Sequence, residues 1–318
     1  MNVVELFNPP IRPLYTTNLG AAILGDSQEL LRHLPDKSVN LILTSPPFAL
    51  TRKKEYGNKA EDEYVEWFLE FVKEFKRILK EDGSFVVDLG GAFLPNSPIK
   101  SVYQFDLLVR MVREIGLYLA QDFYHYNPAR LPTPAEWVNV RRIRVKDAVN
   151  TVWWMSVSEF PKANNRNILK PYSKAMKQLL QNGYKAKLRP SGHDISDKFQ
   201  KDNNGAIPPN LIELANTESN SAYLRRCKEA GIKPHPARFP LEFPRMFIDF
   251  LTDEGDIVLD PFAGSNTTGQ AAEITNRRWL AFEIDETYLM GSLYRFQEVN
   301  DLFSLGKYNG QHQQTRTS

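Results

Sequence analysis

Residues 256–269 read DIVLDPFAGSNTTG, and this stretch decides the fold. A buried strand is expected to end at Asp260, and a helix is expected to begin near Thr267. Gly264 lets the backbone between them turn tightly against a ligand, and the helix start offers free backbone N–H groups. Asn266 stands where a second glycine is usual, and asparagine tolerates the left-handed backbone better than most residues. This order predicts a ligand-binding corner in an open α/β sheet.

The next strand, WLAFEI at 279–284, brings an acid to the same corner. Glu283 follows the glycine turn by one strand–helix–strand unit, where a carboxylate can bind both hydroxyls of a ribose. The turn has neither the G-x-G-x-x-G spacing nor a G-K-[ST] phosphate loop, and Asp260 suits a methionine ammonium group. The pattern therefore favours S-adenosylmethionine over NAD, and the competing interpretation is a plain capped turn. The expected cofactor contacts are Asp260, Phe262, Gly264, Ser265, Asn266, Thr267 and Glu283.

Strands and helices alternate through the first half of the chain. Apolar runs at 21–25, 39–45 and 84–90 are typical of buried strands. A short helix at 27–35 and helical spacing at 63–80 separate these runs, and a second crossover helix is expected at 106–117. The tripeptide EDG at 81–83 is expected to end the helix at 63–80. Residues 118–126 and 150–157 are two later strands, with the pattern of an edge hairpin. Because helices lie between buried strands, the sequence predicts a mostly parallel sheet covered on both faces.

A second motif, TSPPF at 44–48, leaves one of these strands. An exocyclic amino group of a nucleobase is a poor nucleophile, because its lone pair is delocalised into the ring. Hydrogen-bond acceptors held in a preorganised site localise that pair, and Ser45 Oγ and the Pro46 carbonyl are such acceptors. Pro46 and Pro47 hold the backbone, and Phe48 offers a ring for stacking. Asp88, at the end of the strand 84–90, is placed to take a further hydrogen bond or the proton.

Together these motifs resemble the amino-methylating DNA methyltransferases of the beta arrangement. The resemblance rests on residues 44–58, 84–92, 134–154, 189–194, 207–211, 235–240 and 264–269, which span most of the chain. It implies a seven-stranded, circularly permuted, Rossmann-like sheet with a smaller target-recognition module. It also implies cofactor roles for Asp26, near the adenine amine, and Phe239, near the methionine end. In this family the Ser-Pro-Pro-Phe form goes mostly with cytosine N4.

The expected domain boundaries follow changes in composition along the chain. Residues 1–158 form the catalytic half, and the turn-rich residues 159–234 form the recognition module. Residues 235–305 form the cofactor-binding half, beginning with a proline-punctuated helix at 235–252. The polar tail 306–318 is expected to be disordered.

Basic residues gather beside these motifs. Singly, each run is more typical of a solvated face, but around one base pocket they become candidate phosphate contacts. These candidates are Arg52, Lys53, Lys54, Arg141, Arg142 and Arg144. The lone Cys227 has no proline before it, which argues against cytosine carbon-5 chemistry. The scattered histidines give no metal-site pattern, so no metal is expected.

Composition limits the classes of protein to which the chain can belong. The 318 residues carry a net charge of +2 and one cysteine, and neither a signal pattern nor a membrane-length apolar run is present. We expect a cytoplasmic, nucleoid-associated enzyme acting on double-stranded DNA, with a separate restriction endonuclease as a further partner. The resemblance hints at a short palindromic target such as CAGCTG.

The predicted function is site-specific transfer of a methyl group from S-adenosylmethionine to cytosine N4 of a flipped base. An adenine-N6 enzyme of the same fold is the nearest alternative, because the amine chemistry is shared. An RNA or protein amide methyltransferase and an inactive nucleic-acid-binding protein are the others. The large middle module and the order of the motifs argue against the RNA or protein enzyme.

Overall fold

The computed structural model describes residues 2–48, 61–182, 201–215 and 221–296. Its strands are β1 (Tyr15–Thr16), β2 (Gly20–Leu24), β3 (Val39–Thr44), β4 (Leu79–Leu89), β5 (Tyr118–Tyr126), β6 (Val149–Ser156), β7 (Leu211–Glu213), β8 (Ile257–Asp260) and β9 (Arg278–Glu283). Its α-helices are α1 (Ser27–Arg32), α2 (Glu61–Ile78), α3 (Tyr103–Arg113), α4 (Lys174–Asn182), α5 (Ala222–Glu229), α6 (Glu242–Leu251), α7 (Thr267–Ile274) and α8 (Glu286–Ser292). Shorter helical turns are η1 (Val3–Leu6), η2 (Glu136–Val140), η3 (Asn165–Ile168) and η6 (Leu293–Arg295).

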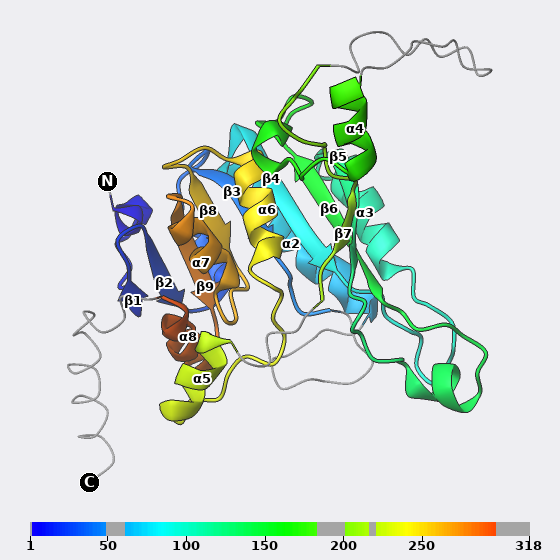
Figure 1. Cartoon of the computed structure of the whole chain (residues 1–318). Helices are drawn as coiled ribbons and strands as arrows, with labels where there is room; N and C mark the ends of the chain where they lie inside the picture. The colour runs from blue at the N-terminus through cyan, green and yellow to red at the C-terminus, as the bar shows by residue number, and fades with distance from the viewer. Residues whose placement is uncertain (1, 49–60, 183–200, 216–220, 297–318) are drawn as a thin grey trace.

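One sheet organises the molecule (Figure 1). Its strand order is β1-β2-β9-β8-β3-β4-β6-β5-β7. The run from β2 to β4 is parallel, whereas β6 lies antiparallel to both β4 and β5. Strands β8 and β9, from the C-terminal part of the chain, therefore lie between β2 and β3, which come from the N-terminal part. This order brings the carboxyl ends of five parallel strands to one edge of the sheet.

Two hydrophobic cores cover the two faces of the sheet. One core joins strand side chains such as Ile42 and Phe85 to α1, α2 and α3. The other joins Leu41 and Val86 to α6, α7 and α8. Neighbouring residues on β3 and β4 thus point into opposite cores, as the pleat of a strand requires. Apolar residues throughout these strands are explained by burial on both faces.

The predicted class of sheet is confirmed, with two differences at its edges. The expected seven strands run from β2 to β5, and the described residues add β1 and β7 outside them. These two strands have two and three residues, too few to show a strand pattern in the sequence. The prediction that β5 and β6 form a hairpin is correct, but its edge position is wrong. β6 pairs with β4, and β7 pairs with the outer side of β5.

Three element boundaries also differ from the sequence prediction. Residues 81–83 lie within β4, where the pairing with β3 shifts register, instead of ending a helix before the strand. The helix predicted at 106–117 spans Tyr103–Arg113, and Gly116, with a φ of +72°, lies between its end and β5, in agreement with a helix that glycine ends. The predicted helix at 235–252 is helical only from Glu242 onward. Residues 235–241 instead form an irregular segment whose side chains reach the site described below.

Residues 159–234 do not gather in one place in their described part. Strand β7 joins the main sheet, whereas α4 and α5 lie at opposite ends of the molecule (Figure 1). Lys162 also forms ion pairs with Asp253 and Asp256, beside β8. The domain boundaries and the circular permutation stay predictions. Among the described residues, no helix is both long and apolar enough to cross a bilayer.

Candidate active site

A cavity of about 860 Å³ opens at the carboxyl-end edge of the parallel strands. Ligands of open α/β sheets bind at this edge, because the loops that leave the strands diverge there. Most of the predicted catalytic and cofactor residues line this one cavity. They are Asp26, Ser45, Pro46, Pro47, Phe48, Asp88, Phe239, Asp260, Phe262, Gly264, Ser265, Thr267 and Glu283.

The turn between β8 and α7 has the backbone that the sequence predicts. Gly264 has φ +51° and Asn266 has φ +55°, so both adopt the left-handed conformation. The Asn266 side chain caps α7 by accepting from the Gly269 N–H at 3.0 Å, and its amide donates to Tyr15 Oη at 3.0 Å. Asn266 is therefore buried behind the turn and does not line the cavity. Its role as a cofactor contact stays a prediction, and the structure assigns it a capping role.

Glu283 is held at the turn by backbone donors. One carboxylate oxygen accepts from the Gly264 N–H at 2.7 Å, and the other accepts from the N–H groups of Ile284 and Asp285, each at 3.0 Å. Burial raises the pKa of Glu283 above its ordinary value. A carboxylate offers about four acceptor sites, so these three bonds leave capacity for a hydroxyl donor in the cavity. Both the position and the chemistry suit the predicted ribose contact.

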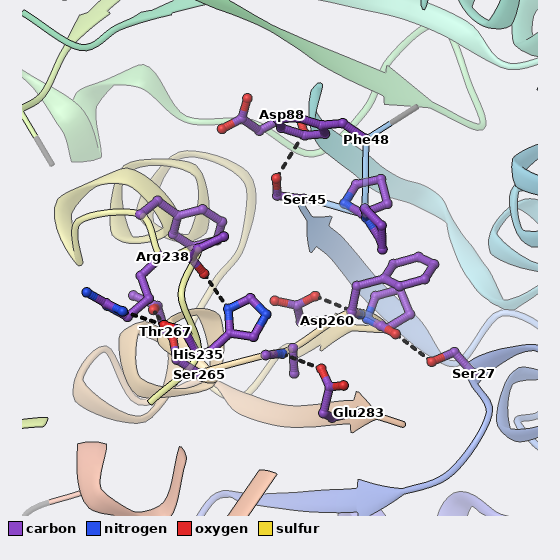
Figure 2. A pocket seen from close by; sticks show the side chains of 18 of the residues that line it. Ser27, Ser45, Phe48, Asp88, His235, Arg238, Asp260, Ser265, Thr267 and Glu283 are labelled. Carbon is purple, nitrogen blue, oxygen red and sulfur yellow. Dashed lines mark hydrogen bonds between the residues drawn. The ribbon is translucent and has the colours of Figure 1, made fainter. Parts of the chain in front are cut away.

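Asp260 links the two sequence motifs. Its carboxylate accepts from Thr44 Oγ1 at 2.7 Å, from Thr268 Oγ1 at 2.7 Å and from the Phe262 N–H at 3.1 Å. Thr44 immediately precedes the Ser-Pro-Pro-Phe stretch, and Thr268 lies in the first turn of α7. Burial raises the pKa of Asp260 to about 6, although these hydrogen bonds oppose the shift. In Figure 2, Asp260 lies between Ser45 and Glu283.

The remaining predicted cofactor residues surround this acid. Asp26 caps α1 by accepting from the Gln28 N–H at 2.8 Å, and it lines the cavity. Phe262 packs against Trp67 and Phe71 of α2, with ring centroids 5.9 and 5.0 Å away. Phe239 packs against Phe243 of α6, with centroids 5.1 Å apart. The cavity thus has apolar walls with a few carboxylates and hydroxyls, as small-molecule sites usually have.

The Ser-Pro-Pro-Phe stretch forms the opposite end of the cavity (Figure 2). Ser45 Oγ donates to the backbone carbonyl of Asp88 at 3.1 Å, which orients the hydroxyl. The Phe48 ring lies against the backbone of the loop after β4. A Cβ atom at Gly90 would come 2.4 Å from Phe48 Cε2, so only glycine leaves room for the ring there.

The Asp88 side chain points away from Ser45 (Figure 2). Its Oδ2 lies 3.3 Å from Nδ1 of His125 on β5, and the imidazole stacks on Phe243 at 4.8 Å. Among the described residues, Asp88 Oδ1 and His125 Nε2 are buried with no hydrogen-bond partner. Asp88 is therefore in the cavity wall as predicted, while its role as proton acceptor stays a prediction.

Sequence reasoning missed a polar wall contributed by the β5–β6 hairpin. Its residues are His125, Asn127, Arg130 and Asn150, and Arg130 donates to Asn150 Oδ1 at 2.9 Å. The available signal was position, because His125 lies at the carboxyl end of the predicted strand 118–126. Also missed were Ser27, which donates to the Pro261 carbonyl, and the Trp67 and Phe71 rings.

The predicted DNA-contact residues that the structure describes are not in the cavity. Arg141 pairs with Glu136 at 2.8 Å and lies over the Trp137 ring at 5.0 Å, and Arg142 is exposed. Arg144 lies over the Phe93 ring at 4.9 Å and donates to the Pro98 carbonyl. All three are on the loop between β5 and β6. Arg52, Lys53 and Lys54 lie outside the described residues, and so do residues 306–318.

Cys227 is buried in α5 and does not line the cavity. Burial raises the pKa of its thiol, which disfavours a nucleophilic thiolate. Within the described ranges, no three His, Cys, Asp or Glu side chains come together as a metal site.

An acceptor loop that faces a glycine turn across one cavity, with the buried Asp260 and the partly buried Glu283 at that turn, is the arrangement expected of an amino methyltransferase. The chain belongs to the DNA methylase family of N6 and N4 enzymes, which it matches over residues 39–293. Both the class and the family agree with the resemblance inferred from the sequence.

Individual relatives support this assignment. The type II methyltransferase M.PvuII of Proteus hauseri is 53% identical over 94% of this chain and 90% of its own length. A solved structure of PvuII DNA methyltransferase (cytosine-N4-specific) superposes with a TM-score of 0.75 at 46% identity, covering 92% of this chain and 94% of that one. TTHA0409 of Thermus thermophilus, solved with S-adenosyl-L-methionine, has a TM-score of 0.54 at 19% identity over 88% of this chain and 95% of its own. That likeness concerns the fold alone.

Proposed function

We propose that this chain is a site-specific DNA methyltransferase that transfers a methyl group from S-adenosylmethionine to N4 of cytosine. The observation that carries the proposal is the Ser45–Phe48 loop facing the Gly264 turn across one cavity, with Asp260 bonded to Thr44 between them. The family match and the 53% identity to M.PvuII confirm the predicted enzyme class, function and cofactor.

The residues at the glycine turn fit the proposed cofactor. Glu283 retains acceptor capacity for a ribose, and Phe262 and Phe239 give the cavity apolar walls. The Asp260 carboxylate, when ionised, supplies the negative charge that a methionine ammonium requires. S-adenosylmethionine, when bound, supplies an electrophilic methyl group on a sulfonium. The protein's task is then to present an amine nitrogen to that methyl in line.

The Ser45 end of the cavity performs this task. Methylation at N4 removes one proton from the amino group, and Asp88 in the cavity wall is the proposed acceptor of that proton. Bound S-adenosylmethionine would supply the methyl group and leave as the neutral thioether. Ser45 Oγ donates to the Asp88 carbonyl, so its lone pairs are free to accept from the amino group and keep the nitrogen pair out of the ring. Proline restricts the backbone at Pro46 and Pro47, which keeps these acceptors in place. Phe48, for which Gly90 leaves room, is the stacking face for the base.

Cytosine is favoured over adenine by the serine at position 45 and by the cytosine-N4-specific relative. The adenine-N6 reaction remains the second candidate, because the acceptor geometry at Ser45 serves either amine. A protein that binds nucleic acid without catalysis has no need for a glycine turn and an acceptor loop sharing one cavity.

The partners and the location follow from the proposed substrate. We propose duplex DNA as the substrate, with its phosphates contacted by the basic loop that carries Arg141, Arg142 and Arg144. A CAGCTG-like palindrome is the proposed target. A separate endonuclease of the same specificity, and a cytoplasmic location at the nucleoid, complete the proposal.

The substrate class is tested by incubating the protein with methyl-labelled S-adenosylmethionine and three acceptors: duplex DNA containing CAGCTG, total RNA, and protein. We expect label in the duplex DNA, and less when the palindrome is scrambled. Label only in RNA or protein, or cofactor binding without transfer to any acceptor, would overturn the proposal.

A further inference from the structure

A buried arginine supports the glycine turn from behind. Arg295, the last residue of η6, is 5% exposed. Its guanidinium donates to the Ser265 carbonyl at 2.6 Å, to Ser265 Oγ at 2.9 Å and to Gln270 Oε1 at 3.2 Å. Gln270 returns a hydrogen bond to the Arg295 carbonyl at 3.0 Å. The turn and the first part of α7 are therefore both tied to one side chain.

The same guanidinium connects the turn to α5. It lies over the Tyr223 ring, 4.4 Å from the ring centroid, and Tyr223 is itself buried. Tyr223 Oη accepts from the His235 N–H at 3.2 Å. His235 lines the cavity directly beside the turn, because a Cβ atom on Gly264 would lie 3.1 Å from its ring. Tyr223 thus connects the turn with the irregular segment that carries Phe239.

We infer that Arg295 and Tyr223 form a brace that positions the cofactor-binding turn for S-adenosylmethionine. The inference rests on the proposed function for its ligand. Arg295 does not line the cavity, so it is a positioning residue that acts through Ser265 and Gly264. Helix α5 lies in the segment expected to recognise DNA, and the brace gives it a second task at the cofactor site.

The physical reason is preorganisation. The turn holds Gly264 and Asn266 in the left-handed backbone, which asparagine tolerates better than most residues but which still costs free energy at any residue other than glycine. Charge-assisted bonds to the Ser265 carbonyl hold that backbone before any ligand arrives. Without these bonds, the turn is formed in only a fraction of the molecules before the cofactor binds. The apparent affinity for S-adenosylmethionine is then the intrinsic affinity multiplied by that fraction.

The test compares Arg295→Met with Arg277→Met. Arg277 is a matched control, because it is 7% exposed and donates to Thr252 and Thr275 at the far end of α7. We expect Arg295→Met to raise the Kd and KM for S-adenosylmethionine about ten- to a hundredfold. Its kcat at saturating cofactor should change much less. We expect Arg277→Met to lose thermal stability while the Kd stays within about twofold of wild type.

A second readout needs no ligand. In cofactor-free protein, amide hydrogen exchange at Gly264 and Asn266 should accelerate in Arg295→Met and not in Arg277→Met. If Arg295→Met does not fold, Arg295→Lys and Tyr223→Leu take its place, with the same expected direction. Wild-type affinity and wild-type exchange in these variants would overturn the brace. If the wild-type protein binds no S-adenosylmethionine, the proposed function fails, and the exchange comparison still decides the brace.

Discussion

Thr44 and Ser45 are adjacent residues whose hydroxyls donate hydrogen bonds to different strands. Thr44 donates to Asp260 at the end of β8, and Ser45 donates to the Asp88 carbonyl on β4. Because β3 lies between β8 and β4, two consecutive residues fasten the acceptor loop to both flanking strands. Each bond contributes about 1 kcal/mol, and together they hold the loop in one orientation. At this scale, we propose that Ser45 positions the amino group and that Asp260 supplies the negative charge for the cofactor.

Ser45→Ala is expected to retain S-adenosylmethionine binding and to lose most turnover. Loss of one preorganised hydrogen-bonding group at a reacting centre costs about a hundredfold or more in kcat. Single-turnover methyl transfer with calorimetric cofactor titration measures both properties. Ser38→Ala is the control, because Ser38 donates to the Pro35 carbonyl just before β3, at the other end of that strand. Wild-type turnover in Ser45→Ala would remove Ser45 from the mechanism.

Cofactor affinity should fall in acid. Burial raises the pKa of Asp260 from 3.8 to about 6, so this carboxyl takes up a proton as the pH falls through 6 and loses its negative charge. We expect the Kd for S-adenosylmethionine to rise below pH 6, by up to about tenfold per pH unit. The raised pKa of Glu283 acts in the same direction. Asp260→Asn should bind weakly at every pH with a flatter profile, and a Kd constant from pH 5 to 8 in the wild type would contradict the assignment.

Site residues whose contacts form only in the folded chain could not be predicted from the sequence. The turn and acceptor residues have local signals, such as the glycine, the prolines and an acid at a set spacing. Arg295 and Tyr223 have no local signal, because the residues that they contact are distant in the sequence, and the only signal for His125 is its position at the carboxyl end of a predicted strand. His125 meets Asp88 across 37 positions, and Arg295 meets Ser265 across 30.

At the scale of elements, the turn between β8 and α7 has three structural tasks. It ends a buried strand, caps a helix through Asn266 and gives the Gly264 N–H to Glu283. The turn was predictable because each of these tasks requires a particular residue type. Strand β7 and the start of β4 were not predictable. They are strands because they pair with a neighbouring strand, and their local composition gives no sign of this.

Gly264→Ala should weaken cofactor binding more than it weakens the fold. Gly264 has φ +51°, and an added Cβ would press on the His235 ring at 3.1 Å. Gly255→Ala is the control, because Gly255 has φ +80° and nothing within 4 Å of an added Cβ. Both variants should lose about 1 kcal/mol of stability from the strained backbone. Only Gly264→Ala should raise the Kd for S-adenosylmethionine, by about tenfold or more, as calorimetry would measure. An equal rise in both variants would show that stability alone controls binding.

At the scale of the whole molecule, the sheet brings distant segments together. The order β9-β8-β3-β4 places the C-terminal glycine turn beside the N-terminal acceptor loop. The parallel sheet was predictable, because apolar runs separated by amphipathic helices permit few other arrangements. The positions of α4 and α5 were not, because turn-rich sequence carries little information on long-range packing (Figure 1).

DNA affinity should depend on salt through the loop between β5 and β6. We expect the double substitution Arg141→Gln, Arg142→Gln to weaken duplex binding. It should also reduce the slope of log K against log salt by about 0.9 for each phosphate that the protein no longer neutralises. Fluorescence anisotropy across a salt series measures both quantities. Arg32→Gln is the control, because Arg32, in the last turn of α1, is paired with Glu29 and does not belong to the loop between β5 and β6. An unchanged slope in the double variant would remove this loop from the DNA interface.

The central claim is that the amine presented at Ser45 is N4 of cytosine. The most direct measurement is mass analysis of nucleosides from duplex DNA that the purified protein has methylated with isotope-labelled S-adenosylmethionine. We predict labelled N4-methylcytosine, and its loss in Ser45→Ala. Labelled N6-methyladenine in its place would contradict the assignment of the base, and the absence of any labelled nucleoside would contradict the assignment of the enzyme.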